Sequence, residues 1–168
     1  MWRIVSARCG RSRRRCTVTR RGRPGPSART RDLAACSVHV DLYLVFGPAL
    51  EVLVASQLTY LRSDPFAVRL VCHADLADPV TWYLSRNTLT VGLWAPAGQG
   101  DVTVRPGTGP ERGSILIGLR TTDGAVELRG CAWELREFLE QTERVVPLGA
   151  EHRHVDLDAL IRQLTQDG

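Results

Sequence analysis

Positive charge is concentrated at one end of this chain. Residues 1–31 hold 11 of the 22 arginines and no acidic residue, whereas residues 32–168 hold the other 11 arginines and all 18 acids. The two parts therefore carry formal charges of +11 and −7. The first part also contains Pro24-Gly25-Pro26 and few apolar residues, a composition that cannot bury enough surface to fold. What remains, about 130 residues, is the usual size of a single domain.

We therefore divide the chain into a disordered, Arg-rich tail at residues 1–36 and one domain at residues 37–168. The tail accounts for the sequence pI of about 9.1, a value that would otherwise favour nucleic acid or anionic lipid as a partner. Its composition is similar to that of a transit peptide, and it is equally well explained as upstream sequence translated from a misplaced start. No apolar run approaches the roughly 20 residues of a membrane helix, so we expect no transmembrane segment.

The residue types present exclude several kinds of catalytic site. Lysine is absent, which excludes Schiff-base chemistry, a Walker-type phosphate lysine and a Ser-Lys dyad. Cys72 and His73 are adjacent, so on a strand their side chains would project to opposite faces. The five cysteines show no CxxC spacing, and we expect no zinc site from them. We therefore expect neither an enzyme nor a cofactor.

One segment near the C-terminus carries four potential metal ligands. In a fully extended chain His152, His154, Asp156 and Asp158 would share one face, which is a plausible ligand set for a divalent metal. The apolar residues from Leu157 to Leu164 instead follow helical spacing, which makes Asp156 an N-cap and Asp158 a first-turn acid. We therefore favour surface or turn roles for the two histidines.

Apolar patterns predict an α+β domain in which short strands precede helices. We expect strands at residues 37–46, 58–62, 66–73, 80–84, 101–105, 114–120 and 125–129, with a tight hairpin at Asp123-Gly124. Ser85 is placed to cap a short helix at residues 86–93, and residues 131–146 have the spacing of an amphipathic helix. With the helix from Asp156, the expected fold comprises antiparallel sheets, a short mid-chain helix and two C-terminal helices.

Acidic residues recur at every third position of the predicted helix at residues 131–146. They are Glu134, Glu137, Glu140 and Glu143. We interpret this row as a solvated face of the helix, and a docking stripe for a basic partner is the alternative.

The short helix at residues 86–93 is our candidate for contact with another protein, because it and its neighbours are more apolar than one small helix needs. The candidate residues are Trp82, Arg86, Asn87, Leu89, Leu93 and Trp94. The alternative is that the apolar members of this set fill the core. Aromatic residues of this kind could also stack on nucleic-acid bases, although core packing is their usual use.

Five segments carry a resemblance to a known family. They are SVHVDLYLVF from Ser37, DPFAVRLVCHA from Asp64, VTWYLSRNTLTVGL from Val80, PAGQGDVTVRP from Pro96 and VVPLGAEHRHVDLDALI from Val145. In this order and spacing they resemble the SsgA-like family of actinomycete sporulation and cell-division regulators, most closely its SsgB branch. The match covers about residues 37 to 167 and leaves the tail out. Asn87-Thr88 departs from the family pattern, which has an acid followed by an apolar residue there.

The resemblance implies a non-enzymatic, cytoplasmic protein that acts at the division septum of a filamentous, spore-forming bacterium. It implies a homotrimer with a whirly-like fold that acts on FtsZ, on septal cell-wall synthesis or on other SsgA-like proteins. A single-stranded nucleic-acid-binding protein is the second hypothesis, motivated by the whirly-like fold and the Arg-rich tail. The −7 charge of the domain argues against it, since binding to phosphates requires positive charge.

Overall fold

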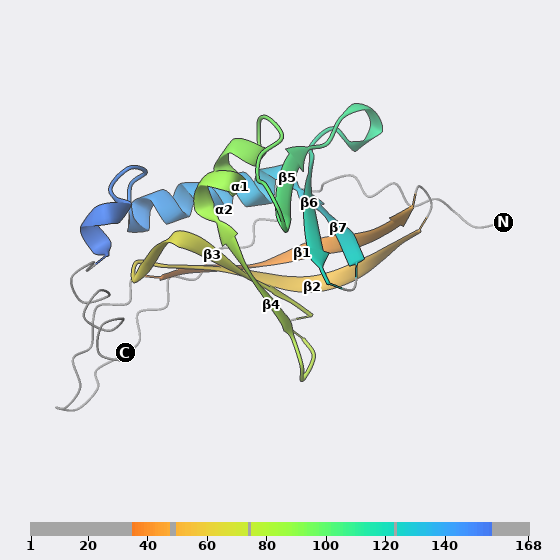
Figure 1. Ribbon diagram of the computed structural model, residues 1–168, viewed down its shortest axis with the longest axis horizontal. Coiled ribbons are helices and arrows are strands. Elements are labelled where there is room, and N and C mark those ends of the chain that lie inside the picture. The colour runs from red at the N-terminus through yellow and green to blue at the C-terminus, as the bar shows by residue number, and fades with distance from the viewer. Residues whose placement is uncertain (1–34, 48–49, 74, 123, 156–168) are drawn as a thin grey trace.

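The computed structural model describes residues 35–47, 50–73, 75–122 and 124–155 (Figure 1). Seven strands, two α-helices and two 3₁₀ turns follow one another along these residues. They are β1 (Ala35–Gly47), β2 (Leu50–Leu61), β3 (Asp64–Cys72), β4 (Val80–Ser85), α1 (Arg86–Gly92), β5 (Val102–Pro106), η1 (Gly109–Glu111), β6 (Ser114–Thr121), β7 (Gly124–Cys131), α2 (Ala132–Val145) and η2 (Glu151–His154).

The strands form one antiparallel sheet in the order β4-β3-β2-β1-β7-β6-β5. β1 and β2 pair along nearly their whole length, from Ala35 opposite Leu61 to Gly47 opposite Leu50. β1 meets β7 only at Tyr43 and Leu44, so a short pairing joins the two halves of the sheet. In Figure 1 the strands β5, β6 and β7 run steeply across the long β1–β2 hairpin.

Both helices cover the same face of the sheet, where the core lies (Figure 1). α2 buries Leu135, Phe138 and Leu139, which recur at helical spacing and form one apolar stripe. On the sheet, alternate residues of β1 such as Val40 and Leu42 point into the same core, because successive side chains of a strand face opposite sides. Burying these two faces against each other is the main source of stability for the domain.

The structure confirms an α+β fold with an antiparallel sheet and a short helix in mid-chain. Ser85 caps α1 as expected, since its hydroxyl accepts a hydrogen bond from the Thr88 N–H at 3.3 Å. The helix expected from Asp156 lies outside the described residues. The whirly-like arrangement that the resemblance implies stays a prediction.

Several strand boundaries differ from those expected. β1 begins at Ala35, two residues before the expected domain boundary at residue 37. β2 begins at Leu50, although the sequence predicts a strand only from residue 58. Residues 50–57 lack the alternation of apolar and polar side chains, because apolar side chains lie on both faces of this end of the hairpin, with Val52 on one and Leu53 on the other.

Candidate functional site

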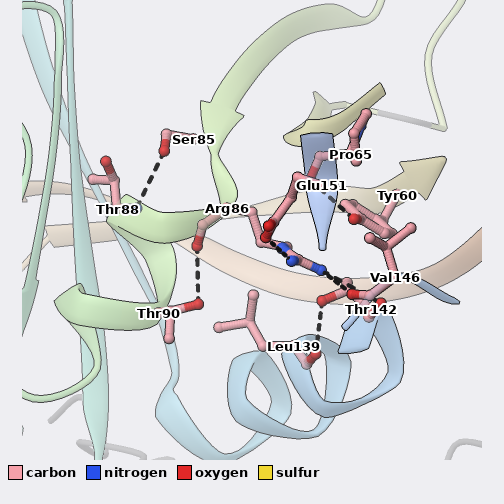
Figure 2. Close-up of polar contacts among 10 residues, drawn as sticks. All are labelled: Tyr60, Pro65, Ser85, Arg86, Thr88, Thr90, Leu139, Thr142, Val146 and Glu151. Carbon is pink, nitrogen blue, oxygen red and sulfur yellow. Dashed lines mark hydrogen bonds and ion pairs between the residues drawn. The ribbon is translucent and has the colours of Figure 1, made fainter. Parts of the chain in front are cut away.

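Arg86, the first residue of α1, has a buried side chain whose exposed fraction is 1%. Its Nη1 donates to the Val146 carbonyl at 2.7 Å and to the Thr142 carbonyl at 3.5 Å. Its Nη2 forms an ion pair with Glu151, and its guanidinium carbon lies 5.0 Å from the centroid of the Tyr60 ring. Figure 2 shows these groups converging on the guanidinium. We call these five residues the Arg86 cluster.

The local sequence places each member of this cluster. The cap at Ser85 starts α1 directly after β4, which sets Arg86 against the end of α2. The carbonyls near a helix C-terminus lack full intrahelical partners and carry negative potential, so a cation there is favourable. The chain then turns through Pro147 to Gly149, whose φ of 82° suits glycine, and returns Glu151 to the guanidinium. Each guanidinium contact thus joins segments far apart in the sequence.

The surroundings shift the pKa values of two side chains in the cluster, Glu151 and Tyr60. Burial by itself would raise the pKa of Glu151, but hydrogen bonds from backbone N–H groups and from Arg86 outweigh it and hold that pKa below its usual 4.5. Burial is the main reason that the pKa of Tyr60 is raised, and its hydroxyl donates to the Pro65 carbonyl at 2.9 Å. The cluster therefore contains a carboxylate and a neutral phenol at neutral pH, which suits a structural contact.

Arg86→Met should lower the free energy of unfolding by about 3 kcal/mol, because it leaves the Glu151 carboxylate and two helix-end carbonyls without their cation. Urea denaturation of the full chain measures this loss. The matched control is Arg105→Met, which breaks an ion pair with Glu127 at 2.9 Å between side chains that are 43% and 35% exposed. It should cost only about 0–1 kcal/mol. Equal losses in the two variants would contradict a structural role for Arg86.

The stability contributed by Glu151 should depend on pH. Its folded pKa is lowered, so its contribution is fully present above the unfolded pKa near 4.5 and is lost as the pH falls through the folded pKa. Glu151→Gln removes this acidic titration and should flatten the loss of stability as the pH falls below the unfolded pKa near 4.5. Glu140→Gln, an exposed position on α2, is the control and should follow the wild-type profile. An unchanged slope in Glu151→Gln would argue against the ion pair.

A cavity inside the domain is too small to hold a small-molecule substrate. This cavity lies between the sheet and α2, is lined mainly by apolar side chains such as Leu42, Ile117 and Leu135, and has a volume of about 10 Å³. One water molecule already needs roughly 10–15 Å³. The described part of the chain contains no group of three or more His, Cys, Asp or Glu side chains that could hold a metal ion.

His152 and His154 lie in η2 and are exposed. In a 3₁₀ turn, residues two apart point in different directions, so the two imidazoles do not share the face that an extended chain would give them. Asp156 and Asp158 lie outside the described residues. Within the described ranges, no helix is long and apolar enough to span a membrane.

The six candidate contact residues separate into interior and surface positions. Arg86, Leu89 and Leu93 are buried, so the alternative that the apolar residues fill the core holds for both leucines. Trp82 is partly buried and packs against the core, whereas Asn87 is exposed. Trp94 is 70% exposed, which leaves it as the main apolar residue of this set on the surface.

A second tryptophan, Trp133, which the sequence analysis did not single out, lies one helical turn from the arginine that contacts Trp94. The guanidinium of Arg136 on α2 lies 4.6 Å from the Trp94 ring centroid. Trp133 precedes Arg136 by one helical turn and is 61% exposed, and Val91 at the end of α1 is also exposed. We call Val91, Trp94, Trp133 and Arg136 the tryptophan surface. The helical spacing of α2 contained the signal, because Trp133 points away from the apolar stripe.

The far end of the β1–β2 hairpin forms another apolar surface. Its exposed residues are Phe46, Leu50, Val52 and Leu53, which we call the hairpin surface. Leu53 lies opposite Tyr43 in the register, and the Arg129 guanidinium lies 5.2 Å from the Tyr43 ring centroid. Four large apolar side chains at one end of a hairpin are more than isolated surface residues, and such patches mark interaction sites.

Comparison with known proteins places these features in a family. The family model described as "Streptomyces sporulation and cell division protein, SsgA" matches residues 54–151. The sporulation-specific cell division protein SsgB of Streptomyces coelicolor is 37% identical over 124 residues, covering 74% of this chain and 89% of the relative. SsgB of Kineococcus radiotolerans is 40% identical over 129 residues, covering 76% of each chain.

Solved structures agree with the sequence matches. A structure from work on SsgB mutations and longitudinal cell division during sporulation of Streptomyces coelicolor superposes with a TM-score of 0.69 at 34% identity, covering 73% of this chain and 97% of that chain. An SsgA-like sporulation-specific cell division protein from Thermobifida fusca gives a TM-score of 0.68 at 31% identity. That match covers 77% of this chain and 94% of the solved chain. The resemblance of the five sequence segments is therefore confirmed, and this chain belongs to the SsgA family of sporulation and cell division proteins.

Proposed function

We propose that this protein is a non-catalytic regulator of sporulation-specific cell division that recruits or positions FtsZ and the septal cell-wall machinery. In this proposal it acts from the cytoplasm at the division septum. Relatives named sporulation-specific cell division proteins support the general role. The tryptophan surface is the observation that supports an adaptor, because exposed tryptophan beside arginine is typical of surfaces that bind other proteins.

The composition of the tryptophan surface suits protein recognition. Tryptophan and arginine are the residue types most enriched among those that dominate binding energy at interfaces. The Arg136 guanidinium stacks on Trp94 and thereby holds that ring in place, which lowers the entropy lost on binding. Glu137 and Glu140 are exposed on the same solvent-facing side of α2 as Trp133. The surface therefore fits an apolar patch with a basic rim on the partner.

The hairpin surface is proposed as the contact between copies in a homotrimer. At this end of the hairpin both faces carry large apolar side chains, since Leu44 lies opposite Val52 on one face and Tyr43 lies opposite Leu53 on the other, beside the ion pair of Glu51 with Arg129. A solvated hairpin normally keeps one face polar. A second and third copy that present the same apolar surface would cover both faces, which isolated monomers leave in water.

Leu53→Glu should reduce the molar mass of the full chain about threefold in light scattering, because it places a carboxylate in the proposed contact. Leu148→Glu is the control: Leu148 is also partly exposed but lies in the turn after α2, and its substitution should leave the mass unchanged. A Leu53→Glu variant that keeps its wild-type mass would rule out the hairpin surface as the trimer contact.

The double variant Trp94→Ala with Trp133→Ala should bind FtsZ at least about tenfold more weakly than the wild type in a pull-down or by surface plasmon resonance. Both rings are exposed, so the far-UV circular dichroism spectrum should not change. Phe66→Ala with Tyr83→Ala is the matched control, because it removes two similarly exposed aromatic rings from β3 and β4. Wild-type binding by the tryptophan variant, or no FtsZ binding by the wild type, would refute the adaptor proposal.

A further inference from the structure

The outer face of α2 combines exposed aromatic surface with negative charge. Trp133, Glu137 and Glu140 lie opposite the apolar stripe that packs on the sheet, and all three are exposed. Glu143 is exposed on the next turn after Glu140. None of these three glutamates takes part in an ion pair of the described residues. The face is therefore open to a ligand from another part of the chain or from a partner.

This face favours a ligand that carries arginine. α2 contains four glutamates and two arginines, and the guanidinium of one of these, Arg136, is already stacked on Trp94. The other, Arg144, lies in the last turn of the helix. Guanidinium groups pair with carboxylates through two parallel hydrogen bonds and also stack on tryptophan, so arginine matches both kinds of group on this face.

The chain enters the domain near the C-terminal end of α2. Ala35, the first residue of β1, lies opposite Leu61. Arg62, which follows Leu61, donates from Nη2 to the Val145 carbonyl at the end of α2, at 3.4 Å. Figure 1 shows the start of β1 and the end of α2 at the same end of the molecule. A coil of 34 residues spans roughly 30 Å on average, more than the roughly 21 Å length of the 14-residue α2, so residues 1–34 can reach the whole outer face.

We propose that the Arg-rich segment at residues 1–31 binds the outer face of α2 and covers Trp133. Its 11 arginines, with no acidic residue among them, complement the −7 charge of residues 32–168. Single exposed ion pairs are weak, but a tethered segment acts at an effective concentration in roughly the millimolar range, so that several such pairs add up. The occupant is thus a segment of the same chain, and anionic lipid or nucleic acid would compete with α2 for it.

The proposed contact makes the segment a competitor for the tryptophan surface. This step rests on the function proposed above: if Trp133 binds a division protein, the segment occupies the same surface and must be displaced first. The apparent affinity for the partner then falls by the fraction of molecules in which the surface is free. The binding of the segment to α2 does not depend on that function, so the two are tested separately.

Limited digestion of the full chain with trypsin tests the contact. The chain has no lysine, so trypsin cleaves it only after arginine, and an arginine bound to α2 cannot enter the active site of the protease. When binding and release are fast, the rate of cleavage follows the population of the free segment. The triple variant Glu137→Gln, Glu140→Gln and Glu143→Gln should therefore be cleaved within residues 1–31 at least about threefold faster than the wild type. Mass spectrometry of the products locates the first cleavages.

The matched control removes three carboxylates that are exposed in loops outside α2: Asp75→Asn, Asp78→Asn and Asp101→Asn. It changes the net charge of the domain by the same amount and should be cleaved at the wild-type rate. About 0.5 M salt should abolish the difference between the wild type and the α2 variant, since ion pairs at the surface are screened. Cleavage confined to residues 1–31 shows that the domain stays folded, because an unfolded domain would also be cut at internal arginines such as Arg69.

Each outcome decides the proposal. Equal rates in the wild type and the α2 variant would overturn it. Equal acceleration in the α2 variant and the control would also overturn it, because the attraction would then be to the acidic domain as a whole. A segment that is cleaved freely and becomes protected only with phosphatidylglycerol vesicles or single-stranded DNA has a different ligand, which likewise overturns the proposal.

The competition is tested by adding FtsZ, the partner of the proposed function. Displacement of the segment should speed the cleavage of the wild type about threefold, to the rate of the α2 variant. FtsZ that binds without changing this rate would contradict the competition. FtsZ that does not bind would refute the proposed function and leave the comparison between the α2 variant and its control intact.

Discussion

A buried guanidinium organises the helical layer of this domain. An arginine away from water is stable only if several acceptors surround it, and here they come from three separate segments: the carboxylate of Glu151, the carbonyls at the end of α2, and the ring of Tyr60 on β2. The arrangement is not fully satisfied, since Nε of Arg86 is buried and has no hydrogen-bond partner among the described residues. The remaining contacts nevertheless fix the start of α1 against the end of α2.

The position of the tryptophan surface follows from this contact. Trp94 follows α1 and Trp133 lies in the first turn of α2, so their separation depends on how the two helices pack. The helices share Arg86 at one end and the Arg136–Trp94 stacking at the other. A rigid pair of helices can present two aromatic rings at a constant distance, which reduces the ordering cost of binding. The cluster thus links the stability of the domain to the proposed adaptor role.

Local patterns in the sequence predicted the elements that depend on neighbouring residues. The capped start of α1 and the stripe of α2 are both set within one or two helical turns, and both were placed correctly. The first half of β2 was missed because its apolar side chains occupy both faces, which removes the alternation that marks a strand. Pairing with β1, and not a local pattern, makes that stretch a strand.

The roles of single residues were harder to predict than the elements. Arg86 was placed among surface contacts because its partner Glu151 lies 65 residues further along the chain and no local pattern joins them. The same pairing gives a structural role to the segment from Val145, one of the five that resemble the family: it supplies a carbonyl and a carboxylate to Arg86. Trp133 could have been recognised from the helical spacing alone, because a tryptophan opposite the apolar stripe must face solvent.

Native-state hydrogen exchange tests most directly whether the Arg86 cluster joins the two helices into one unit. The Val146 N–H, bonded to the Thr142 carbonyl at 2.9 Å, reports on the end of α2, and the amides of α1 report on the other side of the guanidinium. The account predicts that both sets open with the same free energy, within roughly 1 kcal/mol, as parts of one cooperative unit. Exchange of the Val146 amide through a much easier local opening, while α1 stays protected, would contradict it.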